Sequence, residues 1–409
     1  MMKRAADFLK PIKRLLAENA GYRCSAPSCG KVTVGPGATA NQSAKTGTAC
    51  HIYSAADNGP RGTGGLSAED RQKEENGIWC CKDHGALIDT NQGGRFPAEL
   101  LKHWKRLHRD RILRERDGTR TNLGWMDQLE IINSFWFKPS TKITFSKSTL
   151  FYGNEPSGKS CVCQLLAGIW HSHAVERWRR RNHDIKLNYF APESQTIHLT
   201  IQEREVHRSN ETRRLPQGPS DLRLVYIDEI FDRELRYDSE RDHLSQISTV
   251  FGSDPETVKS LCDDIRVNGH PLWRLMEFRE EHITPNEDEG EPGRDGWYLY
   301  VPVGKYKVPF TGLAKSEQIG VMVQFAAALA RVHSHDAPTV LLLDGGGWNW
   351  LDGLLDAFAP YLAKQPFQVV LVLRSRPLNF GGEPWQEWGA AHFECGEGIG
   401  NNTVTEVSR

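Results

Sequence analysis

The spacing of hydrophobic positions changes along the chain and predicts two regions of different architecture. Apolar residues recur at helical spacing over residues 3–19, despite Pro11, so this stretch predicts a helix. Residues 24–89 are rich in Gly, Pro and Ser, with short strand candidates such as KVTV (31–34), and a helix returns over 96–116. Further on, short apolar runs alternate with longer helical ones; the apolar runs are TKITFSKSTLFYG, LRLVYIDEIF, TVLLLD and QVVLVL. This alternation predicts an α/β architecture.

A polar, glycine-containing stretch separates the two regions. We expect a first domain at residues 1–116, a linker at 117–127 and a second domain at 128–409. The acidic segment PNEDEGEPGRDG (285–296) predicts an exposed loop. No apolar run reaches the roughly 18 residues that a membrane-spanning helix needs, and the N-terminus lacks the unbroken apolar core of a signal peptide. We therefore expect a cytoplasmic protein with no membrane partner.

Charge is divided unevenly between the two regions, although the net charge of the chain is −1. Residues 1–120 contain 21 Lys and Arg against 13 Asp and Glu, a surplus of 8, so the remainder carries −9. The excess is concentrated in KHWKRLHRDRILRER (102–116). Such a basic run is either a solvated helix face or a contact for the phosphate backbone of a nucleic acid. The asymmetry predicts different partners for the two domains.

Two short-spaced pairs of metal-binding residue types flank the loop-rich part of the first domain. Cysteines cluster in the first fifth of the chain, which in a cytoplasmic protein favours metal binding over disulfides. Cys24-x4-Cys29 and Cys81-x2-His84 together offer four ligands, as tetrahedral zinc requires. We therefore predict structural Zn²⁺ at these residues, with the intervening segment closed into a loop.

The segments between and after these pairs form a series: ACHIYSAADNGPR, LSAEDRQKEENGIWCCKDHGALID and FPAELLKHWKRLH. Over residues 22–108 this series resembles HNH endonucleases of the bacterial group that acts in restriction and anti-phage defence. The resemblance implies an α+β fold of the ββα-metal type and metal-dependent hydrolysis of phosphodiester bonds. It makes His51 the general base and Asn76 the residue that holds the hairpin and orients the base. Arg61 is expected to contact phosphate.

The same resemblance sets the register around Gly85, which falls where many HNH proteins carry a histidine that binds the catalytic metal. Asp89, one helical turn further, is then the expected replacement ligand for catalytic Mg²⁺ or Mn²⁺. An alternative assignment makes His84 the catalytic ligand and draws the missing zinc ligand from the remaining cysteines, Cys50 and Cys80. The sequence leaves both assignments open.

The second domain begins with a phosphate-binding motif. GNEPSGKS (153–160) matches G-x-x-x-x-G-K-[ST], follows the apolar run STLFYG and precedes a helical run, as a phosphate-binding loop requires. Lys159 would reach the β and γ phosphates of ATP, and Ser160 would hold Mg²⁺. The nucleotide-binding residues predicted in this loop are Gly153, Asn154, Ser157, Gly158, Lys159 and Ser160.

The order of motifs after this loop resembles ABC-type ATPases, specifically the soluble branch with chromosome-maintenance, repair and phage-defence members. By this resemblance, TVLLLD (339–344) is the Walker B strand and ends in Asp344, which supports magnesium. LAKSEQ (313–318) corresponds to the signature motif, which places Lys315 and Ser316 at the nucleotide.

Three positions depart from the family pattern. Ala314 replaces the signature serine, Gly345 the glutamate that polarises the attacking water, and Arg374 the switch histidine. The resemblance therefore implies a domain that binds ATP and hydrolyses it slowly or not at all. An alternative places the Walker B strand at VYIDE, with Asp228 and Glu229 as its acidic pair.

Together these features imply an α+β zinc-containing HNH domain followed by an α/β P-loop NTPase domain of ABC type. This organisation resembles the Septu anti-phage systems, in which an ABC-type ATPase and an HNH nuclease act together as separate chains. We expect an anti-phage DNA endonuclease controlled by ATP binding, a homodimer or higher oligomer around the nucleotide, and a phage-derived trigger. Two alternatives stay open: an ATP-dependent DNA-binding sensor with a catalytically weak HNH fold, and an RNA-cleaving effector.

Overall fold

The computed structural model divides the chain into two compact units. The first comprises residues 1–121, 190–195 and 334–338, and the second comprises 122–189, 196–333 and 339–409. The structure describes residues 6–26, 29–116, 125–190, 194–210, 213–228, 242–283, 294–345 and 352–407. Three features predicted from the sequence therefore lie wholly or mostly outside the described residues, namely the linker predicted at 117–127, the acidic loop predicted at 285–296 and Glu229.

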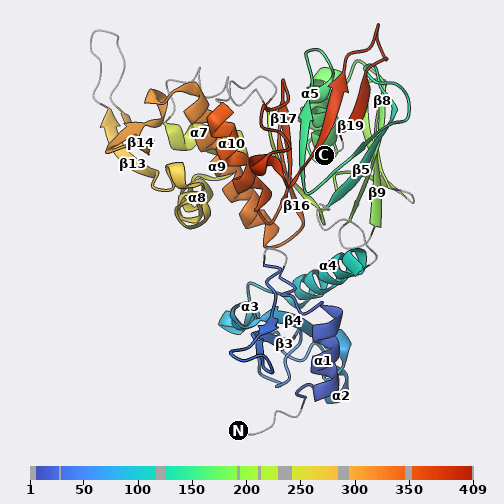
Figure 1. Ribbon diagram of the computed structural model, residues 1–409, viewed down its shortest axis with the longest axis vertical. Coiled ribbons are helices and arrows are strands. Elements are labelled where there is room, and N and C mark those ends of the chain that lie inside the picture. Colours follow the sequence, from blue (N-terminus) through green and yellow to red (C-terminus); the bar gives the residue numbers. More distant parts are fainter. Residues whose placement is uncertain are drawn as a thin grey trace. The chain divides into compact units, whose positions relative to one another are not determined.

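The first unit is built on a two-stranded antiparallel sheet that leads into a short helix (Figure 1). β3 (Gly47–His51) pairs with β4 (Gly77–Cys81), so that His51 lies opposite Gly77. α3 (Lys82–Leu87) follows β4 without a break and packs on β3. The other elements are α1 (Lys10–Asn19), β1 (Val34–Pro36), β2 (Ser43–Lys45), α2 (Ala68–Arg71), η1 (Glu74–Asn76), η2 (Thr90–Gly93) and α4 (Ala98–Arg116). A small core of isoleucines, cysteines and aromatic residues joins β3, β4, α3 and α4; its fully buried members include Ile52, Ile78, Ile88, Cys24 and Cys80.

The first helix is shorter than the sequence pattern predicts. α1 begins at Lys10, with Pro11 in its first turn, where the missing N–H of proline interrupts no intrahelical hydrogen bond. Residues 6–9 are not helical, and Phe8 is buried outside the helix. The predicted strand at 31–34 is also displaced, because only Val34 belongs to a strand, which continues to Pro36.

The second unit centres on a mostly parallel six-stranded sheet, which confirms the α/β architecture expected from the apolar runs. Its strand order is β12-β16-β17-β7-β18-β19, and β19 alone runs antiparallel to its neighbour. Three of its strands are buried along their whole length, which explains their unbroken apolar sequences. The strands are β7 (Ser148–Tyr152), β12 (Arg223–Ile227), β16 (Thr339–Leu343), β17 (Gln368–Leu373), β18 (Trp388–Glu394) and β19 (Thr403–Val407).

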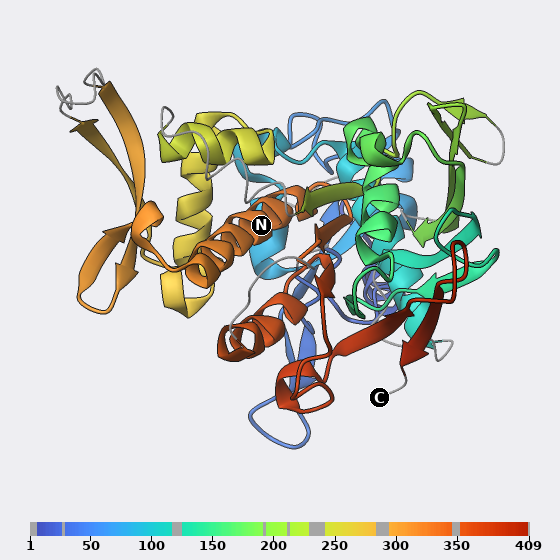
Figure 2. The same ribbon diagram turned by 90° about the horizontal axis from the view of Figure 1, so that it is seen from above.

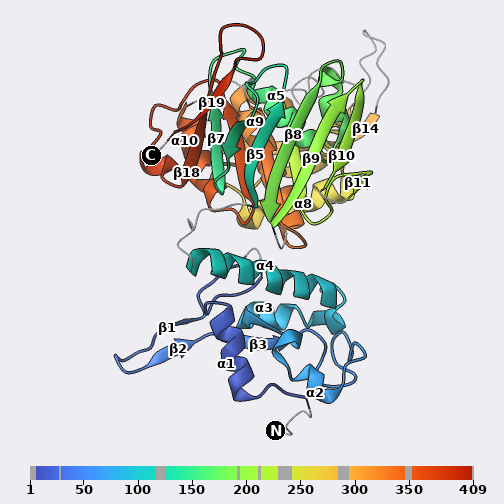
Figure 3. The same cartoon turned by 90° about the vertical axis from the view of Figure 1, so that its right-hand side faces the viewer.

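A second, antiparallel sheet of six strands was not predicted (Figure 3). Its strands are, in spatial order, β11 (Arg214–Leu215), β10 (Glu205–Ser209), β9 (Ser194–Gln202), β8 (His183–Phe190), β5 (Met126–Asn133) and β6 (Thr141–Thr144). The predicted linker ends inside β5, because Met126 is buried and its backbone is hydrogen-bonded to the side chain of Gln368. Arg208 of β10 donates to the carbonyl oxygens of Gly168 and Ile169 at the end of α5 (Lys159–Gly168), which ties this sheet to that helix.

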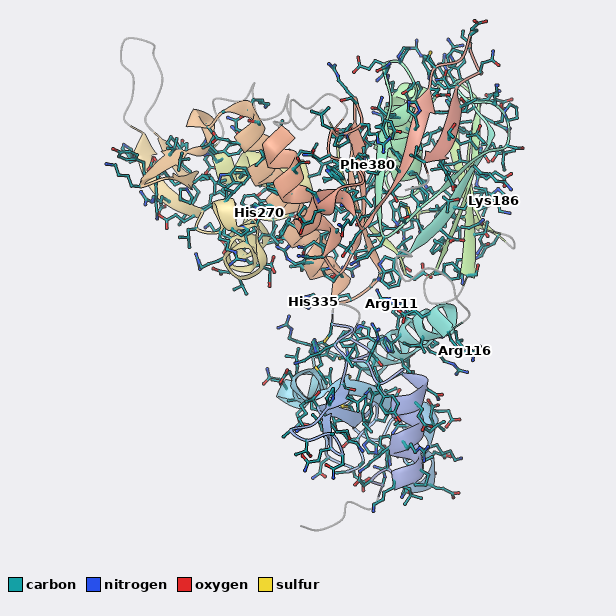
Figure 4. All side chains as sticks on the ribbon, viewed as in Figure 1. Arg111, Arg116, Lys186, His270, His335 and Phe380 are labelled. Atoms are coloured by element: carbon teal, nitrogen blue, oxygen red, sulfur yellow. The ribbon has the colours of Figure 1, made fainter. Side chains whose placement is uncertain are left out.

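Helices and a small third sheet complete the second unit. The helices are α7 (His243–Phe251), α8 (Pro255–Asn268), α9 (Lys315–Ser334) and α10 (Asp352–Ala363), and short 3₁₀ turns are η3 (Ser172–Trp178), η4 (Pro271–Trp273), η5 (Phe310–Gly312) and η6 (Glu383–Trp385). The third sheet comprises β13 (Glu277–Ile283), β14 (Arg294–Val303) and β15 (Tyr306–Pro309), and Figure 2 shows it in orange at one end of the helices. His270, labelled in Figure 4, stacks on Phe358 of α10 and bonds to Gln324 of α9.

Candidate functional site

Four metal-binding side chains of the first unit come together. One ligand atom from each of Cys24, Cys29, Cys81 and His84 lies within 4.8 Å of the others, and the sulfur of Cys81 is 3.2 Å from Nδ1 of His84. Cys24 and Cys81 are buried, whereas Cys29 and His84 are half-buried. The fold creates this arrangement because Cys81 ends β4 and caps α3, whose first turn carries His84. Cys81 and His84, which are close in sequence, thus meet Cys24 and Cys29, which lie far upstream in the chain.

The chemistry of this cluster suits zinc. Thiolate and imidazole are its preferred ligands, and four of them complete a closed tetrahedral shell. Hydrogen bonds from Cys29 and Cys80 lower the pKa of Cys24 strongly, and the same contact with Cys24 raises the pKa of Cys29. A hydrogen bond to Cys24 raises the pKa of His84 to about 9. Zinc binding would displace the protons that these groups share, because thiolate and neutral imidazole are the forms that bind the metal.

Cys50 and Cys80, the cysteines of the alternative assignment, lie beside this cluster. Cys80 is fully buried, and hydrogen bonds to Cys24 and Cys50 raise its pKa well above the usual value. His84 lies with the cysteine pair of the first assignment, so the geometry favours that assignment.

His51, the predicted general base, lies at the end of β3 on the wall of a pocket of about 520 Å³. Its Nε2 is 2.9 Å from the carbonyl oxygen of Ala6, and its ring stacks on Phe8 at 3.7 Å between centroids. Because a carbonyl oxygen only accepts hydrogen bonds, Nε2 carries the proton and Nδ1 is the acceptor. Burial lowers the pKa of His51, so the ring is neutral at neutral pH. A neutral, oriented imidazole can accept a proton.

Asn76 is buried and holds the backbone just after His51. Its Oδ1 accepts from the Tyr53 amide at 2.8 Å, and its Nδ2 donates to the carbonyls of Tyr53 and Arg71 at 2.9 and 3.0 Å. This geometry agrees with a role in holding the hairpin. Asn76 therefore acts on His51 indirectly, through the backbone that joins His51 to Tyr53.

Arg61 has a different role from the expected phosphate contact. Its guanidinium donates to the carbonyl oxygens of Ile52, Ile88 and His51 at 2.6, 2.6 and 3.1 Å, and to Oδ1 of Asp89 at 2.6 Å. The side chain is only 5% exposed. Because these bonds occupy Nε and both terminal nitrogens, Arg61 braces the strand end against the segment after α3. We therefore infer that Arg61 is mainly an internal brace, and the phosphate contact expected of it stays a prediction.

Gly85 and Asp89 decide whether a catalytic metal can be held beside His51. A Cβ at Gly85 would lie 2.6 Å from Cγ2 of Thr48 and 3.0 Å from the sulfur of Cys50, so a histidine there has no room without movement of β3. Asp89 lies beyond the end of α3 rather than within it, and it lines the pocket with His51. Among the described residues, the zinc-type cluster is the one group of three or more metal-binding side chains. Asp89 stays the predicted ligand of a catalytic cation, because Mg²⁺ is commonly held by one or two carboxylates together with water and substrate phosphates.

The basic run at 102–116 forms most of α4, and part of its charge is used within the unit. Lys105 pairs with Glu74 at 3.0 Å and Lys102 with Glu99 at 2.7 Å. Trp104 is buried in the core. Figure 4 labels Arg116, an exposed residue at the end of this helix. Part of the positive charge of α4 is thus neutralised within the unit, and a phosphate contact by its exposed residues stays a prediction.

The phosphate-binding loop of the second unit has the expected local structure. Gly153 and Asn154 follow β7, Ser157 is buried, and Gly158 adopts φ +89° at the N-terminus of α5. A Cβ at Gly158 would lie 2.7 Å from Phe137, so this position requires glycine. Lys159 donates to the carbonyl of Gly153 and, at 3.1 Å, to Ser157 Oγ. Burial lowers the pKa of Lys159. The side chain of Lys159 thus bends toward residues 153–157 of its own loop, where the phosphates of a nucleotide would bind.

Ser160 and Asp344 meet although they are far apart in sequence. Ser160 Oγ donates to Asp344 Oδ1 at 3.0 Å. These are the two groups expected to hold the magnesium ion of MgATP, and their oxygen atoms suit that ion. Asp344 follows β16 and bonds through its N–H to the carbonyl of Ile227, so Asp228 follows β12 at the same edge of the sheet. Both candidate Walker B strands therefore end at the same edge of the sheet, and Asp344 of the first candidate contacts Ser160.

Each of the three positions that depart from the family pattern lies just before or after a helix or strand. Arg374 follows β17 and pairs with Glu155 of the phosphate-binding loop at 3.0 Å. Lys315 and Ser316 form the first turn of α9, and Ala314 precedes them, with its N–H bonded to Glu317. Gly345 follows Asp344, so that turn supplies no glutamate.

The sequence pattern missed the segment before α1. Ala6 and Phe8 hold the ring of His51, and Asp7 and Lys13 line the same pocket. Phe8 falls within the helix predicted over residues 3–19, and in the structure it lies before α1 and packs on His51.

In the part of the chain that the structure describes, no helix is long and apolar enough to cross a membrane. No protein-family model matches the sequence, and no curated protein matches it. Several solved structures are similar to this chain. An SMC head bound to the C-winged helix domain of ScpA is 14% identical, with 69% of this chain and 98% of that chain covered and a TM-score of 0.46. The SMC head domain from Thermotoga maritima is 12% identical over 70% and 100%, with a TM-score of 0.42. The recombination mediator RecF with ATP is 9% identical over 69% and 98%, with a TM-score of 0.42.

Proposed function

We propose that this chain is a DNA endonuclease whose first unit is an HNH-type domain and whose second unit is an ABC-type ATP-binding module. One observation carries the nuclease proposal. A neutral histidine at the end of β3 is held in one tautomer by Ala6, and it lies in a pocket beside a closed Cys/His cluster. The β3, β4 and α3 elements that build this site match the ββα arrangement implied by the resemblance.

The zinc cluster would have a structural role. Cys24, Cys29, Cys81 and His84 would hold Zn²⁺ and fix the start of α3 to the segment that follows α1. Zinc supplies folding free energy to a region with a small core of its own. It thereby keeps β3 and the segment after α3 in the register that positions His51 and Asp89.

In the proposed reaction, Nδ1 of His51 accepts a proton from water, and the resulting hydroxide attacks the phosphorus atom. A bond from oxygen to phosphorus forms, and one backbone P–O bond breaks. The electron pair of the broken bond stays on the leaving sugar oxygen, which takes a proton from solvent water, and Nδ1 of His51 then releases its proton to solvent. Such general-base catalysis contributes about 10²–10⁴ in rate. Asn76 and Arg61 keep the strand end in place, and neither contacts the substrate in this scheme.

The second unit would bind MgATP at its phosphate-binding loop, with Ser160 and Asp344 at the metal ion and Lys159 at the phosphates. Turnover would be slow, because Gly345 offers no carboxylate for the attacking water. In ABC-type heads two protomers enclose the nucleotide, so a homodimer would pair two nuclease sites, as cutting both strands requires. A phage-derived trigger would act through this module in anti-phage defence.

Plasmid cleavage tests the nuclease. The full chain is incubated with supercoiled plasmid and Mg²⁺ or Mn²⁺, with and without ATP. We expect nicked or linear product, reduced at least 100-fold in His51→Ala, while His282→Ala, an exposed histidine of the other unit, cleaves normally. Equal cleavage by His51→Ala and wild type would refute the assignment of the base. Cleavage of RNA with intact plasmid would support the RNA-effector alternative. Phage challenge of cells that carry wild type, His51→Ala or Lys159→Ala tests the defence role.

A second candidate function is an ATP-dependent DNA-binding sensor without cleavage. The specific observation in its favour is Gly85, because a histidine at this position has no room unless the side chains of Thr48 and Cys50 move. Plasmid that stays intact with every divalent cation, together with DNA binding that responds to ATP, would establish this alternative.

A further inference from the structure

Arg61 uses most of its donors in hydrogen bonds within the unit, so another cationic side chain of the His51 pocket is the better candidate for a phosphate contact. Besides His51, the cationic side chains on the pocket wall are Lys13, Arg61 and Lys82. A phosphodiester in this pocket needs a cation beside it, since each backbone phosphate carries a full negative charge. Arg61 is buried and bonded to three carbonyl oxygens and a carboxylate, so it cannot turn toward a substrate without breaking the brace.

Lys13 lies where a phosphate contact is needed. It belongs to α1, which packs against β3 and β4, and its side chain is 43% exposed on the pocket wall. Its Nζ is 3.2 Å from Oδ2 of Asp7, another residue of the wall. An ammonium group has three donors, so this pair leaves capacity for an anion. Asp7 therefore holds the lysine at the pocket mouth without exhausting its hydrogen bonds.

Lys82 is a weaker candidate for the phosphate contact. It is the first residue of α3, directly after the zinc-cluster residue Cys81, and its N–H is bonded to the carbonyl of Thr46. Its side chain is exposed. Lys13, by contrast, pairs with Asp7, which stands between Ala6 and Phe8, the two residues that contact the His51 ring. Burial is the main cause that lowers the pKa of His51, and the charge of Lys13 also lowers it. Lys13 is thus within electrostatic reach of the base.

We propose that Lys13 binds the scissile phosphate of DNA in the His51 pocket. It thereby takes the role of phosphate contact that the sequence predicted for Arg61. This inference rests on the proposed nuclease function. The N-terminal segment and α1 then contribute twice to one site: Ala6 and Phe8 orient the base, and Lys13 holds the phosphate that the activated water attacks. An ammonium contact of this kind is a charge-assisted hydrogen bond, and it strengthens as charge develops on the phosphate oxygens.

The test compares full-length Lys13→Ala, Lys13→Arg and Lys10→Ala. Lys10 is a matched control, because it is an exposed lysine of the same helix that does not line the pocket. Binding of a short blunt-ended DNA duplex is measured in EDTA over a series of salt concentrations. Loss of one phosphate contact weakens binding and lowers the slope of log K against log salt by about 0.9. We expect this in Lys13→Ala, with Lys13→Arg and Lys10→Ala close to wild type.

Two further measurements make the outcome decisive. With Mn²⁺ present, Lys13→Ala should cleave plasmid about 100-fold more slowly than Lys10→Ala. By NMR, the pKa of His51 should be higher in Lys13→Ala than in wild type, while zinc content and thermal unfolding stay unchanged. A Lys13→Ala variant that binds and cleaves like wild type, or that loses no more than Lys10→Ala, overturns the proposal and leaves the nuclease function standing. Duplex binding that depends on Lys13 in a wild-type protein that does not cut supports the phosphate contact and refutes the nuclease function instead.

Discussion

The assignment of Arg61 as an internal brace makes a prediction opposite to that for a phosphate contact. In Arg61→Ala, the carbonyl oxygens of His51, Ile52 and Ile88 lose a charged donor, and Asp89 loses its partner. Hydrogen bonds from charged donors contribute about 1.5–3 kcal/mol each. Water in the adjoining pocket would replace part of this, which leaves about 1 kcal/mol for each carbonyl. The ion pair adds little, because Asp89 is 48% exposed.

The expected loss is therefore about 3 kcal/mol of unfolding free energy for the first unit, or a fall in its Tm of about 10 °C or more. Thermal unfolding of the full chain is followed together with hydrogen–deuterium exchange in peptides that span residues 47–56 and 84–92. Both peptides should exchange faster in Arg61→Ala. The control is Arg95→Ala, which removes an exposed arginine of the same unit.

A phosphate contact would give the reverse pattern. An Arg61→Ala variant with wild-type Tm and wild-type exchange, but with weakened DNA binding, would refute the reasoning and restore the assignment made from the sequence. Arg61→Lys offers an intermediate case, because one ammonium cannot reach all the acceptors that the guanidinium fork spans.

Four further predictions follow from the two sites. The wild-type chain should contain one zinc ion by elemental analysis, and His84→Ala should lose it, whereas Cys395→Ser, which removes an exposed cysteine, should retain it. Gly85→Ala should lower the unfolding free energy by about 1–3 kcal/mol in denaturant titrations, because the added Cβ overlaps Thr48; an unchanged midpoint would contradict the packing argument. Cleavage should rise with pH through a pKa below 6.5 and then level off, because burial lowers the pKa of His51. Between that lowered pKa and 6.5, His51 is protonated in the unfolded chain but neutral in the folded chain. The free energy of unfolding should therefore also rise with pH in this range. Lys159→Ala should abolish ATP binding in calorimetry, and a wild-type turnover of several ATP per second that depends on Lys159 would exclude slow hydrolysis.

The sequence determined those features that depend on residue type and short spacing. Continuous apolar runs predicted the buried parallel strands, since a strand covered on both faces needs no polar alternation. GNEPSGKS predicted a loop between strand and helix, because its glycines permit the backbone that the loop needs. The two Cys/His pairs predicted a cluster, because ligands three to five residues apart can face one ion.

Some elements were readable in principle and were missed. β8 and β9 alternate buried and half-buried residues, which is the period of a half-covered antiparallel strand. The charge run at 102–116 obscured the fact that α4 is anchored by Trp104 and that Lys105 is paired internally. Pattern alone does not reveal which charges of a helix are already neutralised.

Only the tertiary structure decided how the His51 pocket is made. Arg61 braces this region because carbonyl oxygens from two separate segments, residues 51–52 and residue 88, converge on it, and no local spacing encodes that convergence. Gly85 is required because β3 approaches α3 closely. Ala6, Phe8 and Lys13 joined the site because the chain before and within α1 folds back onto β3. Residue types set the available chemistry, but long-range packing selected which groups face the pocket, since burial and hydrogen-bond saturation are properties of the folded neighbourhood.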